Sequence, residues 1–163
     1  MTQIRAAAAA DADEVCLIYN QGIEDRIATL ETELRTPDER RLWLSSRGPR
    51  HPVIVAEEQG RVVGWGSLNS FNPRAAYDHA ADFSVYIERA WRGKGVGRTL
   101  LEALIERARA LGYHKLVLAA FPFNDMGMRL YERVGFRRVG VYEEHGFVDG
   151  RWVDIVIMEK LLT

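Results

Sequence analysis

Residues 92–97 read RGKGVG, and an amphipathic run, RTLLEALIERARAL, follows directly at residues 98–111. Glycine has no Cβ, so successive main-chain N–H groups in such a loop can approach a bulky anion closely. The helix predicted behind the loop adds its own unpaired N–H groups and the positive end of its dipole. Arg92, Lys94 and Arg98 add positive charge. The stretch predicts a phosphate-binding loop, with a glycine-rich solvated turn as the plainer alternative.

Two widespread phosphate-binding motifs do not fit this loop. The nucleotide P-loop pattern, G-x-x-x-x-G-K-[S/T], does not match the spacing in GKGVGRT. The dinucleotide pattern G-x-G-x-x-G fails because Leu100 occupies the position of the third glycine. A third pattern, Arg/Gln-x-x-Gly-x-Gly/Ala, is satisfied by Arg92, Gly95 and Gly97.

The composition is that of an ordinary globular domain. The chain has 163 residues, is 47% hydrophobic and has a formal net charge of −1, so no net basic field attracts nucleic acid or an acidic membrane. A single cysteine, Cys16, excludes an internal disulfide framework, and the scattered histidines lack metal-ligand spacing. The opening alanine run is too short for a signal peptide, and no apolar run approaches the roughly 20 residues that span a bilayer. We expect one cytoplasmic domain over residues 1–163, with no metal, membrane or nucleic-acid partner.

Hydrophobic periodicity predicts a mixed α/β fold. Strand patterns occupy residues 4–7, 53–58, 61–70, 81–88, 115–121, 136–144 and 152–159. Helical patterns occupy residues 36–46, 97–111 and 124–134, and an earlier helix carries Val15, Ile18 and Tyr19 on one face. Residues 20–33 show no clean period, which indicates a loop or a broken helix. The order β-α-α-β-β-β-α-β-α-β-β predicts a mixed sheet with helices packed on it.

Local signals mark several ends of these elements. Thr36 and Glu39 have the spacing of a capping box at the start of a helix. Gly112 is a predicted helix stop, and Asp149-Gly150 is a strong hairpin-turn signal.

The loop and two neighbouring elements resemble the GNAT N-acetyltransferase superfamily. A strand ending in SVYIE precedes the loop, and the segment from Asn124 through MRLYERVGF resembles the family element N-x-x-(small)-x-x-L-Y-x-x-x-G-F. Asn124 and Tyr131 are two helical turns apart, so both side chains can face one cleft. The resemblance implies an acetyl-coenzyme A site and a mostly antiparallel, seven-stranded sheet, splayed at the cofactor and flanked by about four helices.

The same resemblance implies which residues contact the cofactor. The loop binds the pyrophosphate, and the preceding strand lies beside the pantetheine arm. The implied cofactor-binding residues are Val85, Tyr86, Ile87, Arg92, Gly93, Lys94, Gly95, Val96, Gly97, Arg98 and Asn124. Asn124 is also a favoured residue type for a helix N-cap, and the two roles are compatible.

Three further segments resemble the phosphinothricin, methionine sulfoximine and arsinothricin N-acetyltransferases. They are IYNQGIEDRIATLETE at residues 18–33, FNPRAAYD at residues 71–78 and HGFVDGRWVD at residues 145–154. This likeness covers essentially the whole chain. It implies acetylation of the α-amine of a small amino acid or toxic analogue, and a homodimer. Two alternatives share the cofactor loop: an acetyltransferase of protein N-termini or lysines, and a non-catalytic acyl-coenzyme A sensor.

Acetyl transfer to an amine needs a neutral nucleophile, support for an oxyanion and a proton for the departing thiolate. Asp82 is the candidate base, at a position where the resembled family usually has glutamate. Because aspartate is one methylene shorter, a relaying water is expected. Tyr131 is the candidate acid, and a main-chain N–H of residues 84–86 is expected at the oxyanion. The plainer interpretations are an aspartate satisfied by neighbouring N–H groups or an arginine, and an aromatic core residue.

The acceptor-binding candidates lie in two loops. Arg74 and Tyr77 occupy the loop that holds the acceptor's anionic groups in the resembled enzymes. A guanidinium can grip a carboxylate or phosphinate through paired contacts, although a loop arginine can also be simply solvated. Thr29 and Glu31 are further candidates for the same pocket.

Overall fold

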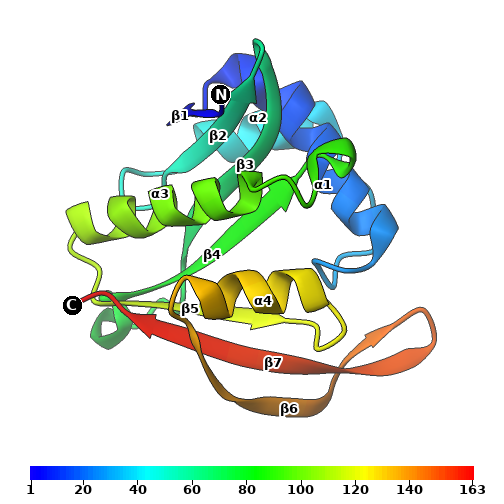
Figure 1. Ribbon diagram of the computed structural model, residues 1–163, viewed down its shortest axis with the longest axis vertical. Helices are drawn as coiled ribbons and strands as arrows, with labels where there is room; N and C mark the ends of the chain where they lie inside the picture. The colour runs from blue at the N-terminus through cyan, green and yellow to red at the C-terminus, as the bar shows by residue number, and fades with distance from the viewer.

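All seven strands of the computed structural model, which describes residues 1–163, belong to one sheet (Figure 1). The strands are β1 (Gln3–Ala6), β2 (Val53–Glu58), β3 (Arg61–Ser70), β4 (Ala80–Ile87), β5 (Lys115–Ala120), β6 (Arg137–Val148) and β7 (Arg151–Leu161). Their order is β1-β2-β3-β4-β5-β7-β6, and every neighbouring pair is antiparallel except β4 and β5. The expected mixed, mostly antiparallel seven-stranded sheet is confirmed.

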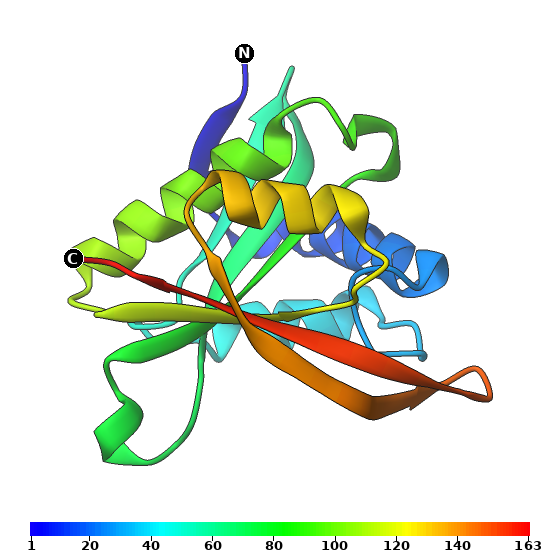
Figure 2. The same ribbon diagram turned by 60° about the horizontal axis from the view of Figure 1, so that its bottom comes forward.

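Four α-helices cover the two faces of this sheet. They are α1 (Ala12–Asp25), α2 (Pro37–Ser45), α3 (Val96–Ala110) and α4 (Asp125–Arg133). Short 3-10 turns occupy Ala9–Asp11, Ala75–Tyr77 and Arg89–Trp91. Helices α3 and α4 lie on one face, and α1 and α2 lie on the other (Figure 1, Figure 2). None of the helices combines the length and the apolar character that crossing a membrane requires.

The central strands β2 and β3 are buried on both faces, which explains their nearly continuous apolar sequence. On one face, Leu100, Leu101 and Leu104 of α3 are fully buried in the larger core. On the other face, Ile18 of α1 packs in a smaller core around Trp65 of β3. Each fully buried leucine or isoleucine contributes roughly 1.5–3 kcal/mol of transfer free energy, so both cores hold the sheet firmly.

Helix α1 is longer than the sequence pattern indicates. Residues 20–25, predicted as a loop or broken helix, continue the helix to Asp25, and Arg26 ends it with a φ of 57°. The apolar period disappears because a polar residue, Gln21, is buried and hydrogen-bonded on the inward face. Gly22 lets the helix approach the sheet, since a Cβ there would lie 3.0 Å from the ring of Tyr86.

Most of the predicted end signals behave as expected. The Thr36 hydroxyl accepts a hydrogen bond from the Glu39 N–H at 3.2 Å, which caps α2, although the Glu39 side chain makes no return bond. Asp149 and Gly150 have φ values of 52° and 77°, as the two central residues of a type I′ turn require. The β6–β7 hairpin that they close projects well beyond the helices (Figure 2).

The sheet splays between β4 and β5. These two strands pair only from Ala80 to Asp82 of β4, opposite Lys115 to Val117 of β5. Beyond Asp82 the strands diverge, while β4 stays paired with β3 as far as Ile87. The main-chain groups along one edge of β4 therefore have no neighbouring strand at residues 83–87.

Candidate active site

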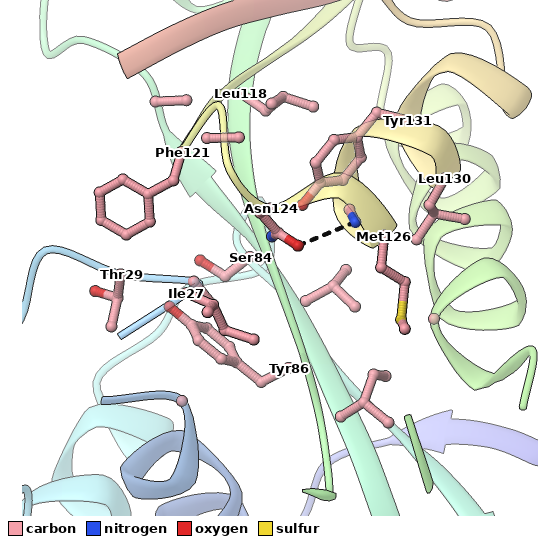
Figure 3. A pocket seen from close by; sticks show the side chains of 18 of the residues that line it. Ile27, Thr29, Ser84, Tyr86, Leu118, Phe121, Asn124, Met126, Leu130 and Tyr131 are labelled. Carbon is pink, nitrogen blue, oxygen red and sulfur yellow. Dashed lines mark hydrogen bonds between the residues drawn. The ribbon is translucent and has the colours of Figure 1, made fainter. Parts of the chain in front are cut away.

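A cavity of about 1270 Å³ occupies the gap between β4 and β5 (Figure 3). This volume exceeds the roughly 300–1,000 Å³ of typical small-molecule sites, so the cavity suits an elongated ligand. Its wall combines the divergent part of β4, the loop at residues 92–98, the start of α4 and the segment after α1. The predicted site residues on this wall are Thr29, Asp82, Val85, Tyr86, Ile87, Arg92, Gly93, Gly95, Gly97, Arg98, Asn124 and Tyr131.

The glycine loop presents free hydrogen-bond donors to one end of the cavity. Gly93 and Gly95 have φ values of 76° and 87°, a conformation that strains residues with a side chain. The N–H groups of residues 93–95 donate to no main-chain carbonyl. Gly95 is the N-cap of α3, whose first N–H groups have no partner in a preceding turn. The loop and the helix dipole together form a site for a large anion.

Helix α1 braces this loop. The Asp25 carboxylate pairs with Arg92 at 2.5 Å and with Arg89 at 2.9 Å. Arg92 also donates to the Ile87 carbonyl at 3.3 Å, so its guanidinium ties the loop to β4 and α1. The Gln21 side chain accepts from the Arg89 N–H at 2.9 Å and donates to Glu88 at 3.2 Å. Gln21 and Asp25 were missed in the sequence, although their spacing of four places them on one helix face.

Three predicted loop residues have other surroundings. The Lys94 side chain is not on the cavity wall, and its ammonium lies 5.1 Å from the centre of the Trp91 ring. Val96 is buried in the larger core, with 2% of its surface exposed. Arg98 lines the cavity but also pairs with Glu102 at 2.8 Å. The contacts of these three side chains with a cofactor stay predictions. The free main-chain N–H groups, and not the side chains, are the feature of the loop that faces an anion.

Asp82 lies on the cavity wall at the point where β4 and β5 separate. Burial raises the pKa of its carboxyl to about 6, against the opposing effect of hydrogen bonds from Asn69 and the Phe83 N–H. No basic side chain forms an ion pair with Asp82, so the interpretation as an arginine-paired aspartate does not apply. A carboxyl with this pKa is mostly ionised near pH 7 and is a better proton acceptor than an exposed aspartate.

Tyr131 extends from α4 into the same cavity (Figure 3). Burial raises the pKa of its phenol to about 12, and the nearby Asp82 carboxylate acts in the same direction. The phenol is therefore protonated at neutral pH, as a proton donor must be. Its ring also packs 6.1 Å from the ring of Phe83, so Tyr131 belongs to the core and to the cavity at once.

Asn124 is the N-cap of α4, and its contact with the cofactor stays a prediction. Its side-chain oxygen accepts a hydrogen bond from the Gly127 N–H at 3.1 Å, which caps α4 (Figure 3). The residue also lines the cavity wall. The cap fixes the side chain beside the position of Tyr131, at the entrance of α4.

This geometry agrees with comparisons to known proteins. A model of the Acetyltransferase (GNAT) family matches residues 19–136. The chain belongs to the GNAT acetyltransferase family. It is 34% identical to the L-methionine sulfoximine/L-methionine sulfone acetyltransferase of Pseudomonas aeruginosa, over 96% of this chain and 92% of that one.

Two solved acetyltransferase structures match nearly the whole chain. A phosphinothricin acetyltransferase from Sinorhizobium meliloti, in complex with acetyl-coenzyme A, has a TM-score of 0.92 at 31% identity, covering 98% of this chain and 88% of that one. A ribosomal-protein-alanine N-acetyltransferase from Brucella melitensis has a TM-score of 0.94 at 36% identity, covering 98% and 99%. The protein is an N-acetyltransferase with acetyl-coenzyme A as donor, and the names of its relatives differ in the acceptor.

The residues of this GNAT chain fit acetyl-coenzyme A. The free N–H groups at residues 93–95 and the start of α3 suit a pyrophosphate. The unpaired edge of β4 offers main-chain donors and acceptors to the amides of a pantetheine arm, in the manner of an added strand. No group of histidine, cysteine, aspartate and glutamate side chains is arranged to hold a metal ion.

The acceptor-binding candidates are not all brought to the cavity. Thr29 lines its wall, whereas Arg74, Tyr77 and Glu31 do not. Arg74 and Tyr77 lie in the exposed loop between β3 and β4, and the Glu31 carboxylate pairs with Arg35 at 3.0 Å. Their roles in acceptor binding stay predictions.

The β6 strand adds two wall residues that the sequence did not indicate as site residues. The rings of Tyr142 and His145 lie 4.6 Å apart and face the cavity from the projecting hairpin. A single histidine in an alternating strand carries no local signal for such a position, because the cavity forms only when β6 folds back beside β7.

Proposed function

We propose that this enzyme acetylates the α-amine of a small amino acid or of a toxic amino-acid analogue of the phosphinothricin, methionine sulfoximine or arsinothricin type. One observation carries the proposal: a partly buried carboxyl without an ion-pair partner and a protonated phenol share one cavity at the opening of the sheet. The whole-length similarity to a methionine sulfoximine acetyltransferase supports the acceptor class. The biological outcome is resistance to, or detoxification of, the analogue.

Each reactive group has a stated task in this proposal. Acetyl-coenzyme A supplies the activated acetyl group. Asp82 accepts the proton of the acceptor's ammonium through a water, which leaves a neutral amine to attack. A main-chain N–H on the open edge of β4, in residues 84–86, donates to the oxygen on which negative charge develops. Tyr131 donates its proton to the sulfur as the C–S bond breaks, and its phenolate takes up the second proton that the nitrogen loses when the amide forms.

The similar proteins also support a second candidate for the acceptor. The similarity to a ribosomal-protein-alanine N-acetyltransferase favours a protein N-terminus as an alternative acceptor. Lysine side chains of proteins are a variant of the second candidate.

A thiol-release screen separates these functions. The acceptors are phosphinothricin, methionine sulfoximine, methionine sulfone, arsinothricin, the ordinary amino acids and a peptide that begins with alanine. We expect coenzyme A release with one or more amino-acid acceptors. Release with the peptide alone would support the second candidate. Acetyl-coenzyme A binding in a titration calorimeter, without release in any mixture, would show that the acceptor belongs to neither class.

We further propose a cytoplasmic homodimer of one domain, residues 1–163. Apolar side chains on the β6–β7 hairpin support this assembly, because Val141, Tyr142, Phe147 and Trp152 are each more than half exposed. The hairpin projects beyond the helices (Figure 2), and exposed apolar side chains gathered in one place are typical of a surface that another chain covers. Light scattering at micromolar concentration is expected to give twice the chain mass of 18.5 kDa, and a monomer mass would remove this part of the proposal.

A further inference from the structure

A row of polar side chains crosses the sheet beside Asp82, on strands that are otherwise apolar. In the register of β3 and β4, Asn69 lies opposite Asp82 and Ser67 lies opposite Ser84. Ser67 is fully buried, and Asn69 is partly buried. Buried polar side chains are costly unless they are hydrogen-bonded, so the bonds within this row indicate why it is polar.

The hydrogen bonds of the row fix the orientation of the Asn69 amide. Its oxygen accepts from an Arg47 nitrogen at 2.8 Å and from the Ser67 hydroxyl at 3.0 Å. Because a guanidinium has only donors, the amide oxygen must face Arg47. The amide nitrogen then faces β4, where it donates to the Ser84 hydroxyl at 3.2 Å. Its register partner on β4 is Asp82, and the amide lowers the pKa of that carboxyl.

Arg47 is itself held rigidly. Its guanidinium donates to the carbonyls of His51 at 2.9 Å and Leu68 at 2.5 Å. It also stacks over the Trp43 ring, 4.4 Å from the ring centre. No carboxylate pairs with it, so the Asn69 oxygen is the side-chain acceptor of this half-buried cation. A positive charge at the amide oxygen polarises the amide and strengthens its N–H as a donor.

Few other groups face the Asp82 carboxyl. From α4 the Tyr131 phenol faces it, and from β5 the register partner is the apolar Val117. The β6 side of the cavity contributes His145, which does not pair with Asp82. The Asn69 amide and the Phe83 N–H are therefore the donors that favour the ionised carboxylate.

We propose that Asn69 is a positioning residue for acetyl transfer: its amide, oriented by Arg47, donates to Asp82 and keeps this carboxyl ionised and aimed at the cavity. The catalytic meaning of this inference rests on the function proposed above, in which Asp82 receives the acceptor's proton. The hydrogen bonds among Arg47, Asn69 and Ser84 do not depend on that function. Two separate measurements can therefore test the network and the chemistry.

The main test replaces Asn69 by leucine, which keeps the volume and removes the donor. In Asn69→Leu we expect the acidic limb of the kcat/KM profile for the acceptor to move upward by about one pH unit. The KM for acetyl-coenzyme A should not change. The matched control is Asn20→Leu on α1, which removes another partly buried asparagine, bonded to the Arg35 main chain at 2.9 Å. This control should lose stability without moving the limb.

A direct titration tests the network without any turnover. With 13C-labelled aspartate, the Asp82 carboxyl signal is identified by its absence in Asp82→Asn and then followed against pH. Its titration should move upward in Asn69→Leu and stay in place in Asn20→Leu. An upward shift in a protein that acetylates no acceptor would support the network and overturn the proposed function instead.

A second variant keeps the test valid if Asn69→Leu does not fold. Arg47→Met retains an unbranched stem against Trp43 and removes the charge that orients the amide. We expect a smaller upward shift of both the limb and the titration, by a few tenths of a pH unit. A folded Asn69→Leu or Arg47→Met protein in which neither observable moves would overturn the inference.

Discussion

The two ends of the cavity differ in how completely one chain builds them. At the donor end, the loop at residues 92–98 is fixed by α1, with Asp25 bonded to Arg92 and Arg89. At the acceptor end, Arg74 lies outside the cavity in an exposed loop, and the projecting hairpin carries exposed aromatic side chains. The donor is the same molecule in every turnover, so a rigid local motif suffices. Acceptor recognition depends on segments that are distant in sequence.

The largest expected effect lies where the two ends meet. Asp82→Asn keeps the shape of the side chain but cannot accept a proton, so kcat should fall by about 10²- to 10⁴-fold. The dissociation constant for acetyl-coenzyme A should stay the same, because the donor end does not use this carboxyl. Stopped-flow thiol release and titration calorimetry measure the two quantities. An unchanged kcat would show that the proton leaves by another route.

The donor end should lose its affinity for acetyl-coenzyme A when Gly95 in its loop is replaced by valine. Gly95 has a φ of 87°, so valine there strains the backbone and crowds the pyrophosphate, and the KM for acetyl-coenzyme A should rise by about 100-fold or more. The matched control is Gly60→Val, which introduces valine at a φ of 77° in the β2–β3 turn. Both variants should be less stable than the unsubstituted protein, and only Gly95→Val should bind acetyl-coenzyme A more weakly. Equal donor affinity in the two would remove the loop assignment.

A smaller effect is expected at the acceptor end. If Arg74 grips an anionic group of the acceptor, losing one charge-assisted contact costs roughly 1.5–3 kcal/mol, about 10- to 150-fold in kcat/KM for the acceptor. Arg74→Ala should show this loss with unchanged donor affinity, and Arg74→Lys should recover part of it. A kinetically silent Arg74→Ala would place acceptor binding elsewhere and favour a peptide or a simple amine.

The smallest effect concerns stability. Burial raises the pKa of Asp82 from an ordinary value of 3.8 to about 6 in the folded chain, so ionisation disfavours the folded state. Between about pH 4 and pH 6 the folded state binds more protons than the unfolded chain, and this group's contribution to stability falls as the pH rises. Asp82→Asn should therefore raise the free energy of unfolding by roughly 1–3 kcal/mol at pH 7.5 and hardly at all at pH 4. Urea unfolding at both pH values measures the difference.

The donor end and the order of the elements could be predicted from sequence because their signals are local. Alternation, apolar stripes and the glycine spacing each occupy a short stretch, and the Gly95 conformation follows from its own residue type. The end of α1 was missed because Gln21 is polar and buried, which removed the apolar period. The link from Arg47 through Asn69 to Asp82 depends on the register of two strands and on a loop packed across them. No short segment contains that information.

Because β4 and β5 pair only briefly, the stability of the folded protein should depend on the concentration of acetyl-coenzyme A. Two parts of the sheet meet over only three residue pairs before they separate, although one hydrophobic core runs beneath both. The cavity at this opening has residues of both β4 and β5 on its wall. A donor bound there at 100 times its dissociation constant would add about 2.7 kcal/mol to the free energy of unfolding. A cell short of acetyl-coenzyme A would then lose the enzyme faster to its proteases, so the abundance of the protein would follow the metabolite that it consumes.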